Sequence, residues 1–419
     1  MGTLWKIAFR NVLRHKRRTA ITGVVLMFGI GVYIMFGAML AGMDRMSIDS
    51  MVDYSTASAK ITSPGYLESM AGTPLDYGLE DPAALEKAAL AAGASATTRR
   101  TAFVGQLSNY VDALPVMAFA VDPATDGKVF ALERAVDAGE WFPGREANEI
   151  VLGRKLAAEL GLSVGDWVVL SSRTRPGAEN ADEFVVVATV DAADPQVASA
   201  GAYVSYEAAE EFLELDGLVT ELDLALPRAA TLDRALEEAD ALAAALRAEF
   251  PELSTRSVKD QAADYLAMRN MKSKFSYVMM LVVLLIGGVG IVNTILMAVY
   301  ARVKEIGVLR AYGMLGRDVK NLFTIEGVIV GAIGSLAGAL FGLALTWYMV
   351  EYGIPVGTFF ADGSLDMGNL PLTGSMYGEW KPLDIVVGFV FGVVVSFIAA
   401  RIPARRAARL EVTDALRFV

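Results

Sequence analysis

Residues 19–43, TAITGVVLMFGIGVYIMFGAMLAGM, form an apolar stretch of 25 residues without a charged side chain. Three further uncharged stretches follow at residues 275–301, 327–350 and 385–400. A helix of roughly 20 apolar residues crosses the ~30 Å hydrocarbon layer of a bilayer, and lipid favours helices because no water bonds to the backbone. The sequence therefore predicts an α-helical membrane protein with four transmembrane helices. The fourth stretch is short, but a lysine and an arginine beside its ends can snorkel to the interface.

The segments between these stretches differ in charge. Residues 44–274 hold 20 basic and 38 acidic side chains, whereas residues 1–18, 302–326 and 401–419 are rich in arginine and lysine. Short basic segments stay in the cytoplasm. We therefore expect an inner-membrane protein with cytoplasmic termini, a large extracytoplasmic domain at 44–274 and a short extracytoplasmic loop at 351–384. The first stretch is longer than the core of a signal peptide and is predicted to stay as an uncleaved anchor.

The composition excludes most enzyme chemistry. The chain has no cysteine and one histidine, His15, in a predicted cytoplasmic segment. The extracytoplasmic domain therefore cannot form a disulfide, a Ser-His-Asp or Cys-His pair, or a His/Cys metal site. A carboxylate site for Ca²⁺ or Mg²⁺ stays open, although no D-x-D-x-D-G loop occurs. We expect no catalytic, cofactor-binding or metal-binding residue in this chain, and the acidic balance argues against a nucleic-acid partner.

Helical patterns flank the first two uncharged stretches. Residues 3–17 place apolar side chains on one face and basic ones on the other. This predicts an amphipathic helix in the inner-leaflet headgroups, the alternative being a topology signal without a fixed conformation. Residues 43–53 and 257–274 continue helical patterns into the extracytoplasmic domain. These two helices are predicted to form a stalk that carries movement outward, or else to pack on the domain as ordinary amphipathic helices.

Between the stalk helices the pattern predicts an α+β domain in one or two lobes, large enough to fold on its own core. Predicted strands lie at residues 60–62, 116–121, 150–152, 167–171, 183–190, 202–204 and 220–226. Predicted helices lie at residues 82–91, 153–160, 206–213 and 231–250. Two of the strands form a predicted hairpin, which is joined by a polar loop at residues 172–182.

The third uncharged stretch is rich in glycine. Its spacing of small residues lets helices approach closely in lipid, and the residues are Gly327, Gly331, Gly334, Gly338 and Gly342. None of the four stretches contains Asp, Glu, Lys or Arg, so a proton- or ion-coupled relay is not expected. The sequence also lacks the G-x-x-x-x-G-K-[ST] loop that cradles ATP phosphates. Energy for transport would therefore come from a partner.

A cytoplasmic segment is suited to contact such a partner. Residues 302–318, RVKEIGVLRAYGMLGRD, predict a short amphipathic helix bounded by glycines, with Glu305 and Arg310 pointing outward. A simple polar connector would not need the apolar side chains of Ile306, Leu309 and Tyr312. This helix can fit a cleft on a cytoplasmic protein.

Three segments resemble the FtsX/MacB/Lol superfamily of ABC permeases. They are residues 300–345, YARVKEIGVLRAYGMLGRDVKNLFTIEGVIVGAIGSLAGALFGLAL, residues 401–419, RIPARRAARLEVTDALRFV, and residues 4–24, LWKIAFRNVLRHKRRTAITGV. In the extracytoplasmic domain, residues 61–69, ITSPGYLES, and 148–170, NEIVLGRKLAAELGLSVGDWVVL, resemble the two-lobed MacB-like periplasmic core. Within the superfamily the chain is most similar to lipoprotein-releasing permeases.

The resemblance implies a mechanotransmission transporter. Two permease copies or paralogues would pair through their first two spans, and two ABC ATPase subunits, which bind the ATP and Mg²⁺, would dock beneath them. The implied docking residues of the coupling helix are Lys304, Glu305, Ile306, Gly307, Leu309, Arg310, Ala311, Tyr312, Gly313 and Met314. The permease itself would not be an enzyme.

The expected function is extraction of lipoproteins from the outer leaflet of the inner membrane and their transfer to a periplasmic carrier. A flexible apolar face suits acyl chains or, equally, a dimer interface, and comprises Met35, Met39, Met43, Phe275 and Met279. Carrier-recruiting permeases have an extended hairpin, whereas the loop at 172–182 is short and offers only Arg173, Arg175 and Pro176 as partner contacts. A second permease could recruit the carrier instead.

Three alternatives remain. One is MacB-type efflux of peptides, toxins or macrolides with a periplasmic adaptor. Another is FtsX-like signalling to a periplasmic hydrolase. The last is a membrane-anchored binding protein without an ATPase.

Overall fold

The computed structural model describes residues 2–14, 16–69, 74–355, 364–366, 371–373 and 375–409. The chain divides into two units. The helical unit comprises Met1–Asp44, Met268–Ile354 and Met376–Val419, and the sheet domain comprises Arg45–Ala267 and Pro355–Ser375. His15 and parts of the predicted segments 351–384 and 401–419 lie outside the described residues.

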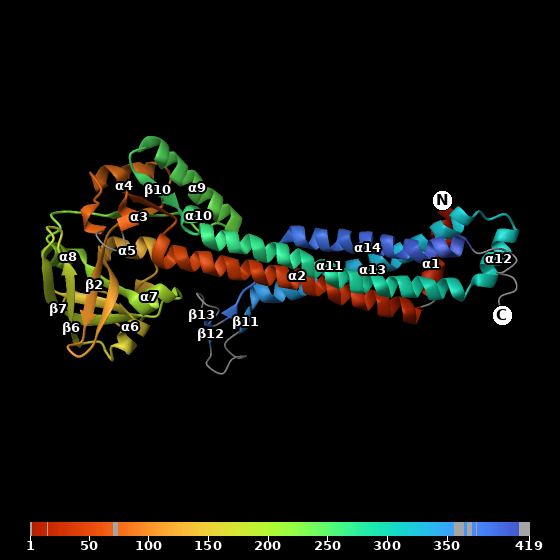
Figure 1. Ribbon diagram of the computed structural model, residues 1–419, viewed down its shortest axis with the longest axis horizontal. Coiled ribbons are helices and arrows are strands. Elements are labelled where there is room, and N and C mark those ends of the chain that lie inside the picture. The colour runs from red at the N-terminus through yellow and green to blue at the C-terminus, as the bar shows by residue number, and fades with distance from the viewer. Residues whose placement is uncertain are drawn as a thin grey trace. The chain divides into compact units, whose positions relative to one another are not determined.

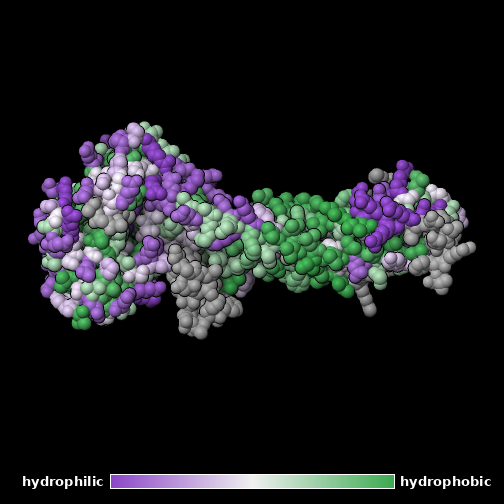
Figure 2. Space-filling model, viewed as in Figure 1, coloured by the Kyte–Doolittle hydropathy of each residue, from purple (hydrophilic) through white to green (hydrophobic). Residues whose placement is uncertain are grey.

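Four helices are long and apolar enough to cross a bilayer, in agreement with the four predicted spans. They are α2 (Lys16–Met51), α11 (Ala263–Tyr300), α13 (Gly316–Glu351) and α14 (Pro382–Ala408), and two shorter helices, α1 (Gly2–Arg14) and α12 (Val303–Ala311), accompany them (Figure 1). Figure 2 shows hydrophobic residues covering the visible face of the middle part of these long helices, with hydrophilic residues toward their ends. Each helix is longer than the uncharged stretch inside it, because charged residues continue the helix at its ends.

The predicted helical extensions of the first two spans are present with one break. Helix α2 continues to Met51 and ends in a π-helical turn, Val52–Thr56. The segment predicted as one helix at 257–274 is divided: α10 (Val258–Gln261) follows Ser257, which caps it, and α11 begins at Ala263. The stalk function of these helices stays a prediction.

The glycines of α13 face two different neighbours. A Cβ added to Gly338 would lie 2.9 Å from Cβ of Ile30 and 3.0 Å from the backbone oxygen of Met27, both on α2. A Cβ on Gly331 would instead collide with Ser396 of α14. Glycine is therefore required for α13 to pack between α2 and α14, and the predicted close approach is confirmed.

The N-terminal helix α1 packs against α13. Ala8 and Val12 are buried in a cluster with Ile329 and Val330, whereas Trp5 is half exposed. Of the apolar stripe predicted for residues 3–17, one part thus packs against α13 and another part is exposed on the surface. The described part of α1 ends at Arg14, next to His15, which lies outside the described residues.

The sheet domain is built on one mixed sheet of ten strands, in the order β10-β1-β9-β2-β3-β8-β5-β7-β4, with β6 pairing β2 and β7. The strands are β1 (Ala59–Thr62), β2 (Ala96–Ser108), β3 (Ala113–Val121), β4 (Val136–Gly139), β5 (Glu149–Gly153), β6 (Trp167–Arg173), β7 (Glu179–Val190), β8 (Gly201–Ser205), β9 (Glu221–Ala225) and β10 (Ser254–Ser257). The pairs β3–β8 and β5–β7 are parallel. Two short pairs, β11 (Ile354–Pro355) with β14 (Ser375–Met376) and β12 (Ser364–Asp366) with β13 (Pro371–Thr373), lie elsewhere in the chain.

Helices cover the sheet of this domain. They are α3 (Tyr66–Ser69), α4 (Pro82–Ala91), α5 (Pro123–Val129), α6 (Arg154–Glu159), α7 (Pro195–Ala200), α8 (Tyr206–Leu213), α9 (Leu232–Glu249) and α10. Helices α6 and α8 bury leucines against one part of the sheet, and α4 and α9 bury theirs against β1 and β9. The seven predicted strands and four predicted helices are all present, so the α+β prediction is confirmed. The division into two lobes stays a prediction.

The sequence reading missed β2, the longest strand, which carries two arginines. Arg100 is buried and forms two hydrogen bonds to Asp126, at 2.7 and 3.0 Å, and its guanidinium lies 3.3 Å from the centre of the Phe130 ring. Lys60 on β1 donates to Glu221 on β9 at 2.5 Å. We call Lys60, Arg100, Asp126, Glu221 and Asp223 the buried charge network.

Strand register brings four members of this network together, while the fifth, Asp126, comes from α5. Lys60 lies opposite Asp223, and Arg100 lies opposite Glu221. The Lys60 ammonium is 3.5 Å from Oδ1 of Asp223, yet neither Asp223 oxygen accepts a hydrogen bond from any described residue. Burial raises the pKa of the Asp223 carboxyl to about 7, and Lys60 opposes that shift. The network therefore holds one carboxyl that titrates near neutral pH.

Candidate functional site

Helix α12 is attached to the helical unit by one face. Val303 is buried, and Ile306 lies in an apolar cluster with Phe323 of α13 and Ala407 of α14. The helix ends before Gly313, whose φ of +96° suits glycine because a side chain would be strained there. Burial of the first turn and a glycine stop thus explain why this predicted helix forms where it does.

The opposite face of α12 is open. Tyr312 is 88% exposed, and Val308 and Leu309 are also exposed. Lys304, Glu305, Ala311 and Gly313 are exposed as well, while Arg310 and Met314 are partly buried. Apolar and aromatic side chains on a short exposed helix are typical of a surface that binds another protein. Ile306 and Gly307 belong to the predicted docking set but are buried, so in this structure they position the helix and are not available for contact.

A buried acid connects this helix to two others. Glu326 on α13 is 4% exposed, and its Oε1 atom accepts hydrogen bonds from Asn11 Nδ2 of α1 at 2.6 Å and from Arg302 Nη1 at 3.0 Å. Arg302 is the N-cap residue of α12. We call Asn11, Arg302 and Glu326 the Glu326 cluster.

The sequence reading missed the Glu326 cluster. It placed Glu326 in the loop at 302–326, whereas the structure places it within α13. The available signal was an acid immediately before an uncharged, glycine-rich stretch, which a charged loop residue also explains. Nothing local pointed to Asn11, 315 residues away in sequence.

The predicted apolar face is only partly exposed. Met35, Met39 and Met43 of α2 are half-buried, while Phe275 and Met279 of α11 are exposed. These side chains are available to lipid, an acyl chain or another subunit. Their role stays a prediction.

The predicted partner loop is shorter than expected. Most of residues 172–182 extend β6 and β7, which leaves a turn at residues 174–178. The backbone N–H of Arg175 donates to Leu213 O at 2.9 Å, and its guanidinium donates to Leu215 O at 2.5 Å. Arg175 therefore fastens the turn to the end of α8 and the residues after it, while Arg173, Arg175 and Pro176 all remain exposed. The prediction of a polar loop over the whole segment is wrong, because the strands pair further than their apolar pattern extends.

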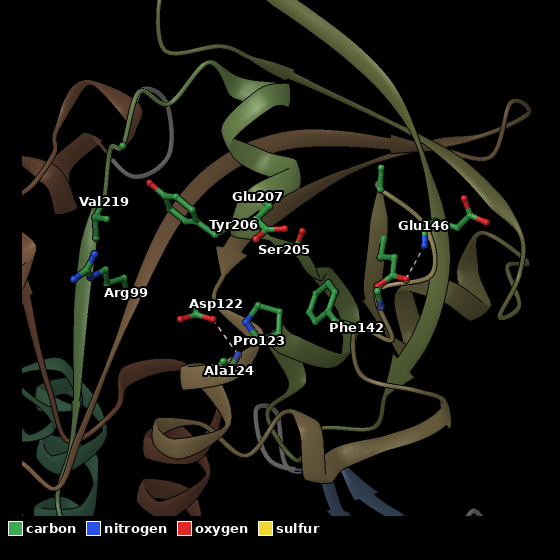
Figure 3. A pocket seen from close by; sticks show the side chains of 14 residues that line it. Arg99, Asp122, Pro123, Ala124, Phe142, Glu146, Ser205, Tyr206, Glu207 and Val219 are labelled. Carbon is green, nitrogen blue, oxygen red and sulfur yellow. Dashed lines mark hydrogen bonds between the residues drawn. The ribbon is translucent and has the colours of Figure 1, made fainter.

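The sheet domain also contains a cleft of about 720 Å³ (Figure 3). Asp122, Glu207 and Phe142 lie on its walls with Tyr206. Arg99 at the edge is held by Glu86 through two hydrogen bonds of 2.7 and 2.8 Å. No predicted site residue lines this cleft. Sequence reading could not find it, because its lining comes from separate loops and helix starts that only the fold brings together.

Within the described residues, no group of three or more His, Cys, Asp or Glu side chains is arranged to hold a metal ion. The expectation that this chain binds no cofactor stays a prediction.

Two protein-family models match the chain. The model of the MacB-like periplasmic core domain matches residues 19–242, and that of the FtsX-like permease C-terminal region matches residues 277–412. The first covers more than half of the chain. Together they include the first span, most of the sheet domain, α12 and the last three spans.

Individual relatives agree with these models. The lipoprotein-releasing system transmembrane protein LolC of Xylella fastidiosa is 28% identical over 312 residues, which are 73% of this chain and 73% of that protein. LolE of Haemophilus influenzae is 26% identical over 329 residues, 72% of each chain. The macrolide export ATP-binding/permease protein MacB of Rhodospirillum rubrum is 31% identical over 136 residues, 32% of this chain and 18% of MacB.

Three findings agree with one another: four candidate membrane helices, a mixed α/β domain that matches the MacB-like core, and a C-terminal third that matches FtsX-like permeases. The chain belongs to the FtsX/MacB/Lol superfamily of ABC transporter permeases.

Proposed function

We propose that this chain is the permease subunit of an ATP-driven transporter that extracts lipoproteins from the outer leaflet of the inner membrane. The observation that supports the permease role is that α12 exposes an apolar face to solvent while its opposite face is buried against the helical unit. An ATPase that binds ATP and Mg²⁺ would hold this face, and its movement would pass through the helical unit to the periplasmic domain. The termini would be cytoplasmic, and the partner permease would be a second copy or a paralogue.

The lipoprotein assignment rests on the extent of the match. The LolC and LolE relatives are similar over nearly three quarters of the chain, whereas the MacB relative is similar over about a third. Efflux of peptides, toxins or macrolides is the second candidate, since the domain matches the MacB-like core model. With its turn at 174–178 fastened by Arg175, this chain offers little to a carrier, so recruitment would fall to the paralogue.

The docking surface is tested by Leu309→Asp. Leu309 is exposed, so the substitution should leave folding intact but weaken ATPase binding by roughly 2 kcal/mol, about thirty-fold in affinity. The ATPase is first identified by mass spectrometry, as the protein with a Walker motif that copurifies with the wild-type permease. The affinity between this ATPase and each purified permease variant is then measured. Leu90→Asp, an exposed leucine on α4 of the sheet domain, is the matched control. Equal affinity of the Leu309 and Leu90 variants would reject docking on α12.

The cargo is tested by depletion. Newly made lipoproteins should accumulate in the inner-membrane fraction, while an unacylated outer-membrane protein should still reach its place. Normal lipoprotein sorting combined with a new sensitivity to macrolides would replace lipoprotein release by efflux.

A further inference from the structure

The Glu326 cluster connects three helices through a single atom. Asn11 of α1 and Arg302 at the start of α12 both donate to Oε1 of Glu326 on α13. The Arg302 and Glu326 side chains are nearly buried, with 10% and 5% of their surfaces exposed. A shift of Arg302 therefore acts on the same oxygen that holds Asn11.

Stability alone is a poor explanation for this cluster. The desolvation of a buried ion pair offsets most of its attraction, and apolar side chains of similar volume are often equally stabilising. What a buried pair adds is direction, because charge-assisted hydrogen bonds are short and angle-dependent. Apolar contacts also hold the two helices: those of Val303 and Ile306 hold α12, and those of Ala8 and Val12 hold α1.

The cluster also lies at the right place to act on the docking helix. Arg302 precedes α12 directly, and only Ala301 and Arg302 separate that helix from the end of α11. Displacement of α12 by a bound protein must therefore move Arg302. The N-terminal helix has no such covalent connection to α12. Its apolar cluster reaches Met314 just beyond α12, and the Glu326 oxygen is the polar link between α1 and the start of α12.

We propose that Glu326 is a positioning residue that couples α12 to α1, so that both move with α13 when a docked ATPase displaces α12. This inference rests on the proposed function, because it needs an ATPase on α12. The functional consequence is that the amphipathic N-terminal helix takes part in the power stroke and is not only a membrane anchor.

Hydrogen exchange of the full-length permease–ATPase complex, with and without ATP and Mg²⁺, tests the coupling. The key variant is the double substitution Glu326→Met with Arg302→Met, which removes the joint but leaves no buried charge unpaired. Asn11→Leu removes only the bond to α1. The exchanged pair Glu326→Arg with Arg302→Glu restores the ion pair, and Asp318→Asn, a partly exposed acid in the first turn of α13, is the control.

In the wild type and the control, nucleotide should change exchange in peptides of both α12 and α1. In the double Met variant and in Asn11→Leu, the change in α12 should remain while that in α1 falls about tenfold, within the usual range of coupling between sites. The exchanged pair should recover most of the α1 response, because the Asn11 carboxamide can flip so that its oxygen accepts from the arginine placed at position 326.

Other outcomes separate the two proposals. No nucleotide response of α12 in the wild type would overturn the proposed function and this inference with it. An α12 response that reaches α1 equally in the double Met variant would overturn only the inference. Fast exchange of α1 without nucleotide in that variant would also overturn it, since the cluster would then merely hold α1 folded.

Discussion

Among the described residues, the sheet domain and the helical unit each contain a buried charge cluster, and these two clusters are built differently. In the sheet domain, backbone ladders place Lys60 opposite Asp223 and Arg100 opposite Glu221 before any side chain is considered, and α5 adds Asp126 to these four. In the helical unit, Asn11, Arg302 and Glu326 come from separate elements that share no ladder. The first cluster is therefore part of what makes the sheet domain rigid. The second depends on side chains alone, so a shift of one helix is felt directly by the others.

The largest effect expected from this difference is in the sheet domain. Arg100→Met leaves Asp126 buried without its bidentate partner and should destabilise the protein by about 3–5 kcal/mol. Thermal unfolding of the purified full-length protein measures this loss. The neighbouring Arg99→Met is the matched control: Arg99 is 41% exposed, and its pair with Glu86 should be worth less than about 1 kcal/mol. If the two variants unfold alike, the network is not a rigid core of the domain.

An intermediate effect is expected where the helical unit packs through backbone contact. Gly338→Leu puts a side chain against Ile30 and the backbone of Met27, so the two helices must separate, at a cost of about 1–3 kcal/mol. Gly290→Leu is the control, since an added Cβ there meets nothing within 4 Å. Detergent-solubilised protein should lose thermal stability in the first variant only. A tolerated Gly338→Leu would mean that α13 does not need close approach to α2.

The smallest effect is a pH dependence that Asp223 should give to the network. The folded pKa of Asp223 is about 7, above the usual ~4 of an unfolded aspartate, so the folded state binds the proton more tightly. The contribution of Asp223 to stability is thus fully present below about pH 4 and is lost as pH rises through 7, with about 1 kcal/mol of the loss falling between about pH 6 and pH 8. Asp223→Asn, which stays neutral, should remove this component from the difference in melting curves. If the stability of the variant falls with pH as steeply as that of the wild type, another group is responsible for the titration.

The two regions also differ in what the sequence predicts. The lengths of the uncharged stretches alone predict α2, α11, α13 and α14, because a single segment that crosses lipid must satisfy its backbone hydrogen bonds internally as a helix. In the sheet domain, alternating apolar strands were found, but β2 was missed because Arg99 and Arg100 look like loop residues. The partner that makes Arg100 acceptable in a core, Asp126, lies on another element. Pairing across elements is a property of the fold, and no local pattern contains it.

The same limit applies to the candidate site. Glycines and an amphipathic pattern were enough to predict α12, since a helix is a local structure. The burial of Ile306 and the joint at Glu326 depend on contacts with α13, α14 and α1. The residues that face a partner could be proposed from the sequence, whereas those that hold the helix in place required the structure.

The two-sided glycine pattern of α13 restricts how the length of this protein can change during evolution. With about 3.6 residues per turn, one inserted residue rotates everything beyond it by about 100°. An insertion between Gly331 and Gly338 would turn one set of small residues away from its neighbour and bring bulky side chains into the contact. The turn at 174–178 is not helical, so an inserted residue there does not rotate a packing face away from its neighbour. Descendants of this chain should therefore gain and lose residues in the hairpin, but vary α13 by substitution only.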